Sequence, residues 1–385
     1  MQAVMYNRKK PVAKVEMEHG KVTKIVSVLN REYVPVLLQK GFDTDSLNNW
    51  IEKRRLPHDR EGFPEVSSRF RYFEKYPESD SPNCMFSLTD QYWFQFDSSQ
   101  TWENGNYFLN PYSEDIGKAF FTPWAFPADH AFRESPDLTT NGLLCKRWTR
   151  DADGTSYMIK AGSRALRQEP ISEVLASIML RKLKILPYVE YELVVEGMRL
   201  CSKCRNFVTE NTEFVPASHI YLQGKRYQNE TIYQCLLRMC KKFRIEGARD
   251  YIDKMIVVDH LLGNEDRHLG NFGFIRNVET LEITGFAPLF DSGYSFVPGN
   301  RAPKANEKKR VYFTKEDKKR ALRRSLRLVD MEKLEDHDEM FDLIDVYPEI
   351  DEEERRYIKD QIINAPDNAL VILKDHDRVE AMART

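Results

Sequence analysis

The sequence has little cysteine, no long apolar run and almost no net charge. Six cysteines among 385 residues lack the density and spacing of a disulfide framework, which favours reduced thiols. No segment has the apolar length of a signal peptide or of a helix that spans a bilayer. We therefore expect a cytoplasmic protein with no membrane partner. The formal net charge of −2 gives no reason to expect nucleic acid as a partner of the whole chain.

Charge is uneven along the chain even though it nearly cancels overall. Residues 301–327 hold twelve Lys or Arg against three acids, whereas residues 331–355 are strongly acidic. Such blocks most often form solvated faces or pair with each other, and a docking surface for an anionic partner is the alternative.

The pattern of strands before helices predicts an α+β protein with two lobes. Residues 1–70 begin with a β-meander around two turns and continue as an accessory subdomain, and residues 71–137 form a loop-rich connection. Residues 138–208 form an N-lobe of strands and one helix, in which Glu169 is expected to precede the helix and Pro170 to lie in its first turn. Residues 209–385 form a helical C-lobe, with helices expected over 231–243 and 248–262.

The most specific pattern is an Asp and an Asn, five residues apart, followed by a second Asp. Asp266 and Asn271 follow a predicted buried helix, and a predicted hairpin returns the chain to Asp291, where Gly293 would permit a sharp turn. Phosphoryl transfer needs a carboxylate that orients the acceptor hydroxyl and oxygen ligands that hold Mg²⁺ on the ATP phosphates. Each piece alone is typical of loop caps or turns, but their order and spacing together favour the catalytic reading.

A second group of residues upstream has the chemistry of a nucleotide site. Lys160 ends a predicted strand and suits contact with phosphates, and Glu173 in the following helix is its expected ion-pair partner. Small residues before the first strand of the N-lobe, with a lysine nearby, could cradle phosphate oxygens, although an ordinary β-turn is equally consistent. These residues are Thr139, Thr140, Asn141, Gly142 and Lys146.

The sequence also offers residues for a zinc site and for a histidine general base. Cys201 and Cys204, with Cys235 and Cys240, could form a zinc site, but the first pair lies in a predicted strand and the second on a predicted helix, where both suit core positions. His268 is counted among the candidate cofactor-binding residues. It suits a histidine that is hydrogen-bonded within the catalytic loop and holds Asp266 in place better than a general base or a ligand. The tryptophans suit core packing better than base stacking: Trp93, Trp102, Trp124 and Trp148.

The run Asn264-Glu265-Asp266-Arg267-His268-Leu269-Gly270-Asn271 resembles the catalytic loop N-x-D-R-H-x-K-N of the HipA-like serine/threonine kinases. The resemblance is best over residues 138–296 and looser over the N-terminal meander. It implies a protein-kinase-like fold, Mg-ATP as cofactor, Asp266 as the catalytic aspartate, and Asn271 and Asp291 on the metal.

The same resemblance implies roles for residues outside this loop. Lys160 would bind ATP phosphates, and the backbones of Arg205 and Phe207 would face the adenine. Thr139 stands where the family has an autophosphorylated serine, with Thr140 as its neighbour, and a separate antitoxin or regulator is an expected partner. Nucleic acid would be contacted only indirectly, because the chain has no evident helix-turn-helix. Gly270 departs from the family pattern, which has lysine there.

We therefore predict transfer of the ATP γ-phosphoryl group to a Ser or Thr hydroxyl on a protein substrate. One alternative is a kinase of the same fold that acts on a small molecule or a lipid headgroup. A second alternative is a non-catalytic nucleotide-binding regulator that contacts nucleic acid through residues 301–327.

Overall fold

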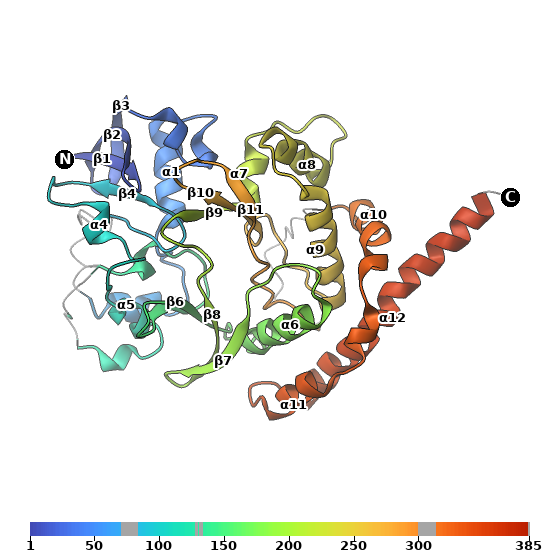
Figure 1. Cartoon of the computed structure of the whole chain (residues 1–385). Coiled ribbons are helices and arrows are strands. Elements are labelled where there is room, and N and C mark those ends of the chain that lie inside the picture. The colour runs from blue at the N-terminus through green and yellow to red at the C-terminus, as the bar shows by residue number, and fades with distance from the viewer. Residues whose placement is uncertain (71–83, 128–129, 131–133, 299–312, 384–385) are drawn as a thin grey trace. The chain divides into compact units, whose positions relative to one another are not determined.

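A computed structural model describes residues 1–70, 84–127, 130, 134–298 and 313–383, without the side chains of 372–383 (Figure 1). The chain divides into two compact units. Unit 1 comprises Met1–Ala161, Val195–Val215 and Phe274–Gly285, and unit 2 comprises Gly162–Val194, Pro216–Gly273 and Phe286–Thr385. The predicted α+β class is confirmed. The four-part division drawn from the sequence stays a prediction.

An antiparallel sheet opens unit 1 in the order β3-β2-β1-β4. Its strands are β1 (Gln2–Asn7), β2 (Lys10–Glu18), β3 (Lys21–Val28) and β4 (Tyr92–Gln95). The predicted meander is therefore present, and a distant strand joins its edge. Apolar residues alternate along these strands and pack on α1 (Thr44–Arg54), which Asp43 caps by accepting the Ser46 N–H at 2.8 Å.

A second sheet has the order β5-β6-β8-β7. Its strands are β5 (Lys146–Arg150), β6 (Ser156–Ala161), β7 (Tyr191–Glu196) and β8 (Arg199–Arg205). The strands expected within residues 138–208 are therefore present. β5 and β6 pair in antiparallel register, so that Lys146 lies opposite Lys160. This register brings the two candidate phosphate-binding lysines onto neighbouring strands.

A three-stranded sheet in the order β11-β10-β9 completes the strands of the described chain. They are β9 (Thr212–Pro216), β10 (Gly273–Asn277) and β11 (Ile283–Phe286). The last two form the hairpin expected downstream of Asn271. Short helical segments link the sheets: α2 (Phe63–Ser67), α4 (Trp102–Gly105), α5 (Asp115–Ala119), and 3-10 turns at Arg31–Tyr33, Val36–Leu38, Pro123–Ala125 and Pro136–Thr139.

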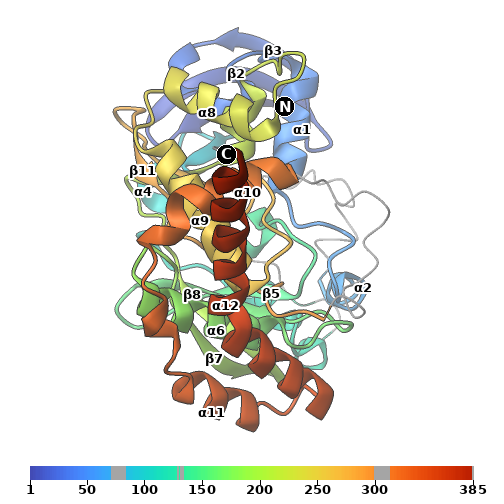
Figure 2. The ribbon, with the colours of Figure 1, turned by 90° about the vertical axis from the view of Figure 1, so that its right-hand side faces the viewer.

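Unit 2 is mainly helical. Its helices are α6 (Glu169–Leu183), α7 (Ala217–Leu222), α8 (Ile232–Lys242), α9 (Ala248–Leu262), α10 (Lys315–Ser325), α11 (Asp338–Val346) and α12 (Glu352–Ala383), with 3-10 turns at Leu326–Leu328 and Met331–Leu334. α9 packs against α8, α10 and α12, and α12 also contacts α10 and α11. Figure 2 shows α12 in front of α9 and α10, and Figure 1 shows its C-terminal half leading away from these helices. No helix in the described part of the chain is both long and apolar enough to cross a membrane.

Helix α9 contacts three other helices of unit 2, and a glycine at each end explains where it begins and ends. Gly247 and Gly263 flank it with φ of 68° and 62°, left-handed backbone that glycine adopts without a Cβ penalty. Most residues between them are buried, apart from a few such as Arg249 at the N-terminal end. The predicted helix over 248–262 is confirmed, and the chain enters the Asp266 loop directly from it.

Two expectations on single residues are wrong. Glu169 is the first residue of α6 rather than a residue before it, because its carboxylate accepts the Ser163 N–H at 2.5 Å and so closes the turn that opens the helix. Trp124 is 61% exposed and is not a core residue, whereas Trp93, Trp102 and Trp148 are buried.

Candidate active site

The loop after α9 is shaped by the side chain of Asn264. Its Nδ2 donates to Oδ1 of Asp259 at 3.1 Å, and its Oδ1 accepts the Asp266 N–H at 3.1 Å. The Gly263 N–H satisfies the carbonyls of Asp259 and His260 at the end of the helix. Asn264 thus couples the last turn of α9 to the backbone of Asp266.

Asp266 and Asn271 lie on one tight turn. The Asp266 carbonyl accepts the His268 N–H at 2.8 Å and the Asn271 Nδ2 at 3.3 Å, and the His268 carbonyl accepts the Asn271 N–H at 2.9 Å. Asp266 is exposed, while Asn271 is buried. The five-residue spacing therefore places the candidate base and one candidate metal ligand side by side.

His268 closes the same turn from its side chain. Its Nδ1 accepts the Gly270 N–H at 3.0 Å. A Cβ placed on Gly270 would lie 2.9 Å from His268 Cε1, so any larger residue there requires the imidazole to move. The departure from the family lysine thus goes together with an imidazole that packs over Gly270 and bonds its backbone.

One buried arginine ties the Asp266 loop to the Asp291 loop. Arg267 forms an ion pair with Asp259 at 3.1 Å, with only 5% of its side chain exposed. Its Nη1 donates to the carbonyls of Asn271, at 2.9 Å, and of Phe290, and its Nη2 donates to Ser292 Oγ at 3.0 Å. The two loops are 20 residues apart in sequence between Asn271 and Asp291, yet they share this guanidinium.

The charge of Arg267 is held in place by its surroundings. Burial by itself lowers the pKa of Arg267, but the carboxylate of Asp259 and, more weakly, that of Asp291 raise it above its usual value. A permanently charged guanidinium inside the unit keeps its partners oriented, because leaving any one of them unpaired is costly.

Asp291 stands on left-handed backbone with φ of 57°, a conformation that Asp tolerates better than most residues. Its N–H donates to the hydroxyl of Tyr191 at 3.2 Å. Gly293 does not have the left-handed backbone expected of a sharp turn. Its Cβ would instead lie 3.2 Å from Oε1 of Glu173 and 3.4 Å from Cβ of Glu169, so glycine is needed for the close approach of α6.

Glu173 is fully buried in unit 2 and lies against the Asp291 loop through Gly293. Lys160, its expected partner, belongs to unit 1. The Lys160–Glu173 ion pair therefore stays a prediction.

In unit 1, the candidate phosphate loop folds beside Lys146. Gly142 has φ of 104°, and a Cβ there would lie 2.3 Å from Lys146 Nζ. The Gly142 N–H donates to Oδ1 of Asn141 at 2.6 Å, so this amide is already engaged in the conformation described. A lysine ammonium over a glycine suits a bound phosphate oxygen at the same place.

Both threonines of this loop are buried, at 5% exposure for Thr139 and 6% for Thr140. The Thr139 hydroxyl donates to the carbonyl of Phe86 at 2.7 Å, and the Thr140 hydroxyl donates to the carbonyl of Pro136 at 2.8 Å and accepts the Trp148 Nε1–H at 2.8 Å. Phosphorylation of either hydroxyl requires the loop to open.

Arg60, which the sequence did not single out, bonds two backbone carbonyls of the Thr139–Gly142 loop. Its Nε donates to the Gly142 carbonyl at 2.9 Å and its Nη2 donates to the Thr140 carbonyl. Its Nη1 is buried without a hydrogen-bond partner among the described residues. Burial lowers the pKa of Arg60 to about 10, against the opposing charge of Asp137.

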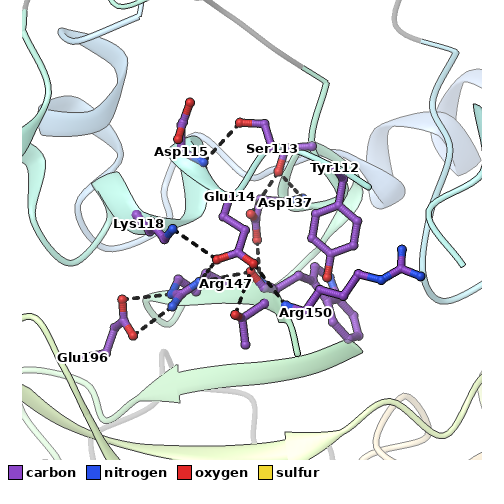
Figure 3. A network of polar contacts seen from close by, with 12 residues as sticks. Tyr112, Ser113, Glu114, Asp115, Lys118, Asp137, Arg147, Arg150 and Glu196 are labelled. Atoms are coloured by element: carbon purple, nitrogen blue, oxygen red, sulfur yellow. Dashed lines mark hydrogen bonds and ion pairs between the residues drawn. The ribbon is translucent and has the colours of Figure 1, made fainter. Parts of the chain in front are cut away.

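A polar network surrounds Arg147 of β5 (Figure 3). Arg147 lies between two carboxylates, with Nη1 2.9 Å from Glu114 and Nη2 3.0 Å from Glu196. The buried Asp137 accepts the Trp148 N–H at 2.9 Å and the Ser135 hydroxyl at 3.0 Å. Burial raises the pKa of Asp137 to about 6. Sequence patterns could not find this network, because its members come from segments without a recognisable motif.

The expected adenine-facing residues lie at and after the end of β8. Arg205 is the last residue of the strand and pairs with Tyr157. Phe207 packs edge-on against Phe214 with ring centroids 5.7 Å apart. The expected contact of their backbones with adenine stays a prediction.

The cysteine pairs considered for zinc lie in different elements. Cys201 and Cys204 are on β8 in unit 1, and Cys235 and Cys240 are on α8 in unit 2. Within the ranges that the structure describes, no group of three or more His, Cys, Asp or Glu side chains is arranged to hold a metal ion.

Comparison with known proteins gives a fold for the whole chain. No protein-family model and no curated protein matches the sequence. HipA of Shewanella oneidensis MR-1, solved with HipB and its operator DNA, is 11% identical, with 97% of this chain and 98% of that chain covered and a TM-score of 0.56. The Helicobacter pylori proinflammatory kinase CtkA is 20% identical, with 59% of this chain and 94% of that chain covered and a TM-score of 0.43.

The sheets, the helical unit and the match to HipA over nearly the whole chain define an α+β protein with a protein-kinase-like fold. More particularly, the fold is that of the HipA-like kinases, and the resemblance drawn from the catalytic loop is confirmed at the level of the fold.

Proposed function

We propose that this protein is an ATP-dependent kinase that transfers the γ-phosphoryl group to a Ser or Thr hydroxyl of a protein. Asp266 accepts or orients the hydroxyl proton, because it is an exposed carboxylate at the start of the turn that carries Asn271. The observation that carries the proposal is the buried Arg267, which bonds the backbone of both the Asp266–Asn271 turn and the Asp291 loop.

The residues of unit 2 fit a magnesium ion. Asn271 uses its Nδ2 as a donor to the Asp266 carbonyl, so its Oδ1 oxygen remains for a cation. Asp291 adds a carboxylate, and oxygen donors of this kind are what Mg²⁺ prefers. Asn271 and Asp291 would hold the ion, which would neutralise charge on the nucleotide phosphates when bound.

The nucleotide phosphates are assigned to unit 1. Lys146 and Lys160 are opposite each other on β5 and β6, and the ammonium of Lys146 lies over Gly142. Two lysines on adjacent strands provide the positive charge that ATP phosphates need. Because Thr139 and Thr140 are buried, we propose that autophosphorylation there is coupled to opening of this loop.

A protein partner is part of the proposal. The HipA with which this chain shares its fold was solved with HipB and operator DNA. We infer that this chain works in the cytoplasm with a separate antitoxin or regulator, through which any contact with nucleic acid is indirect.

The proposal is tested by incubating the full chain with Mg-ATP labelled on the γ-phosphate and a cell extract. Label should enter the protein fraction on Ser or Thr, and Asp266→Ala should lower transfer at least about a hundredfold. The matched control is Glu265→Ala, an exposed carboxylate one residue away, which should retain transfer. Undiminished transfer by Asp266→Ala contradicts the proposal, and label confined to small molecules contradicts the protein substrate.

A further inference from the structure

Helices α8, α9 and α10 enclose a groove on unit 2 that the catalytic residues do not use. One pocket of about 410 Å³ is lined by residues of all three helices, and a second of about 530 Å³ continues it past the N-terminal end of α9. The two pockets share Leu237, Lys241 and Arg249. We call the combined feature the α8–α10 groove.

Three arginines of the groove are fixed by carboxylates of their own. Arg238 bonds Glu230 at 2.8 Å, Arg320 bonds Glu316 at 3.1 Å, and Arg324 bonds Asp253 at 2.6 Å. Within each pair the two charges neutralise each other. The carboxylate that pairs with Arg324 is buried, whereas the Arg320–Glu316 pair is exposed. The three arginines define the shape of the groove without giving it a surplus charge.

The other ionisable residues of the lining are Lys241, Arg244 and Arg249 against Asp317 and Glu246, three cations less two carboxylates, which leaves a net charge of one positive unit. Of these cations, Lys241 and Arg249 are common to the two pockets. Both are exposed, and neither forms an ion pair with any residue that the structure describes. They lie in both pockets, one on α8 and one on α9. The positive charge of Arg249 reaches the groove wall, where it opposes the larger effect of burial on the pKa of Tyr233. Two cations at the junction of the pockets therefore call for an anionic ligand.

The floor of the groove narrows the class of ligand. Leu237 and Tyr233, which we call the floor, line the groove together with the charged residues. An acidic peptide can place its carboxylates on the cations and its methylenes on the floor. A nucleic-acid duplex is too wide to enter, since its recognition relies on helices or strands that enter its own major groove, about 12 Å wide.

The groove and the Asp266–Asn271 turn lie at opposite ends of helix α9. Arg249 is in the first turn of α9, and Asp266 follows the other end of this 15-residue helix. At a rise of 1.5 Å per residue the helix spans roughly 22 Å. An extended peptide covers that distance in about seven residues. A peptide bound in the groove could therefore bring one of its hydroxyl groups to Asp266 if about seven or more residues of the peptide separate that hydroxyl from the bound segment.

We propose that the α8–α10 groove docks an acidic segment of the protein substrate, with Lys241 and Arg249 as its principal contacts. This inference rests on the proposed kinase function for its purpose, although the binding itself does not require catalysis. It assigns the substrate class as proteins that carry a run of Asp or Glu about seven or more residues from the acceptor Ser or Thr.

The test measures binding of a fluorescein-labelled octaglutamate peptide to the full chain by fluorescence anisotropy. Lys241→Glu combined with Arg249→Glu should weaken binding at least about tenfold, because two attractive contacts become repulsive. The matched control is Lys254→Glu, on α9 but outside the groove, where Lys254 pairs with Asp250 at 2.8 Å. It should stay within about twofold of the unchanged protein, the usual size of a surface charge effect. Equal binding by the double variant overturns the proposal.

Two further arms keep this result separate from the kinase proposal. Asp266→Ala should bind octaglutamate as the unchanged chain does, whatever its transfer activity. In the transfer assay with cell extract, octaglutamate and the double variant should each reduce labelling of extract proteins while leaving hydrolysis of ATP alone unchanged. Undiminished labelling in both cases overturns the docking role. Tighter binding of a single-stranded RNA of equal charge, lost in the same double variant, also overturns it.

Discussion

Each of the two units has a buried arginine that holds candidate functional loops, and the two arginines differ in the groups that pair with them. Arg267 in unit 2 faces a carboxylate directly and bonds two loops at once. Arg60 in unit 1 bonds the carbonyls of Thr140 and Gly142, but its Nη1 is buried without a partner in the described chain. Burial lowers the pKa of both arginines, but the carboxylate of Asp259 outweighs burial at Arg267 and raises its pKa, whereas the pKa of Arg60 falls to about 10.

From this difference we expect the Asp266–Asn271 turn to be harder to open than the Thr139–Gly142 loop. A buried ion pair is costly to break, since removing one partner leaves the other charge unsolvated. The loop at Thr139–Gly142 is held by hydrogen bonds from its two threonines and from Arg60, which contacts no carboxylate directly among the described residues, and such bonds are easier to release. If the proposed kinase function holds, a turn that resists opening in unit 2 and a more easily released loop in unit 1 would make the loop of unit 1 the part whose conformation regulates activity.

The largest effect is expected from Arg267→Met. The substitution leaves Asp259 buried without its partner, so the free energy of unfolding should fall by about 3–5 kcal/mol. Phosphoryl transfer should fall more than tenfold through misplaced Asn271 and Asp291 rather than through lost chemistry. Urea denaturation and the transfer assay measure the two effects.

The control for this variant is the double substitution Arg267→Met with Asp259→Leu, which removes both charges. It should recover much of the lost stability but not the transfer activity, because the loops still lack their common donor. Full transfer activity in either variant would mean that Arg267 does not position the loops.

A medium effect is expected on the pH dependence of the free energy of unfolding when Asp137 is substituted. Its folded-state pKa of about 6 lies above the ordinary value of 3.8, so the folded protein retains a proton that the unfolded chain loses between these limits. Stability therefore falls as pH rises from about 4 to about 6, by about 3 kcal/mol from this group. In Asp137→Asn this part of the fall should vanish, as measured by urea unfolding at pH 4, 5, 6 and 7.

The matched control is Asp153→Asn on an exposed turn, where hydrogen bonds from Thr155 lower the pKa of the carboxyl. It should leave the slope between pH 4 and 6 in place. The same slope in wild type and Asp137→Asn would show that Asp137 is ionised in the folded protein throughout.

The smallest effect is expected from Arg60→Met. It removes hydrogen bonds to the carbonyls of Gly142 and Thr140 without leaving a directly paired carboxylate, so the loss of stability should be about 1–3 kcal/mol. Amide hydrogen exchange over 139–143 should accelerate while exchange in α9 does not change.

Arg55→Met is the control for this comparison, since Arg55 also bonds a backbone carbonyl of unit 1, that of Gly20 at 2.6 Å. Its loss should leave exchange over 139–143 as it is. Unaltered exchange at this loop in Arg60→Met would contradict the view that Arg60 keeps it closed.

Much of the fold could be predicted because local rules fix it. The meander and α9 follow from alternation, turn residues and glycine caps, all of which act within a few residues. Glu169 was misplaced because a side-chain bond to the Ser163 N–H draws it into the helix. Trp124 was misplaced because composition says that tryptophan is usually buried but not which one.

Some residues of the candidate site could likewise be predicted from the sequence, and others could not. The Asp266–Asn271 spacing is local and could be recognised from the sequence. The residues that hold the loops could not, because Arg60 lies 80 residues from Thr140 and Asp137 lies 11 residues from Trp148, and only folding brings them together. Gly293 shows a third case, in which the residue was correctly singled out but for the wrong physical reason.

We propose above that Asn271 and Asp291, whose loops both bond Arg267, bind the metal that accompanies ATP. The most direct test of this proposal is ATP binding by titration calorimetry with and without Mg²⁺, in the unchanged chain and in Asp291→Ala. The account predicts that Mg²⁺ strengthens ATP binding only in the unchanged chain, and that the two proteins bind ATP equally without the metal. An equal strengthening by Mg²⁺ in both proteins would contradict it.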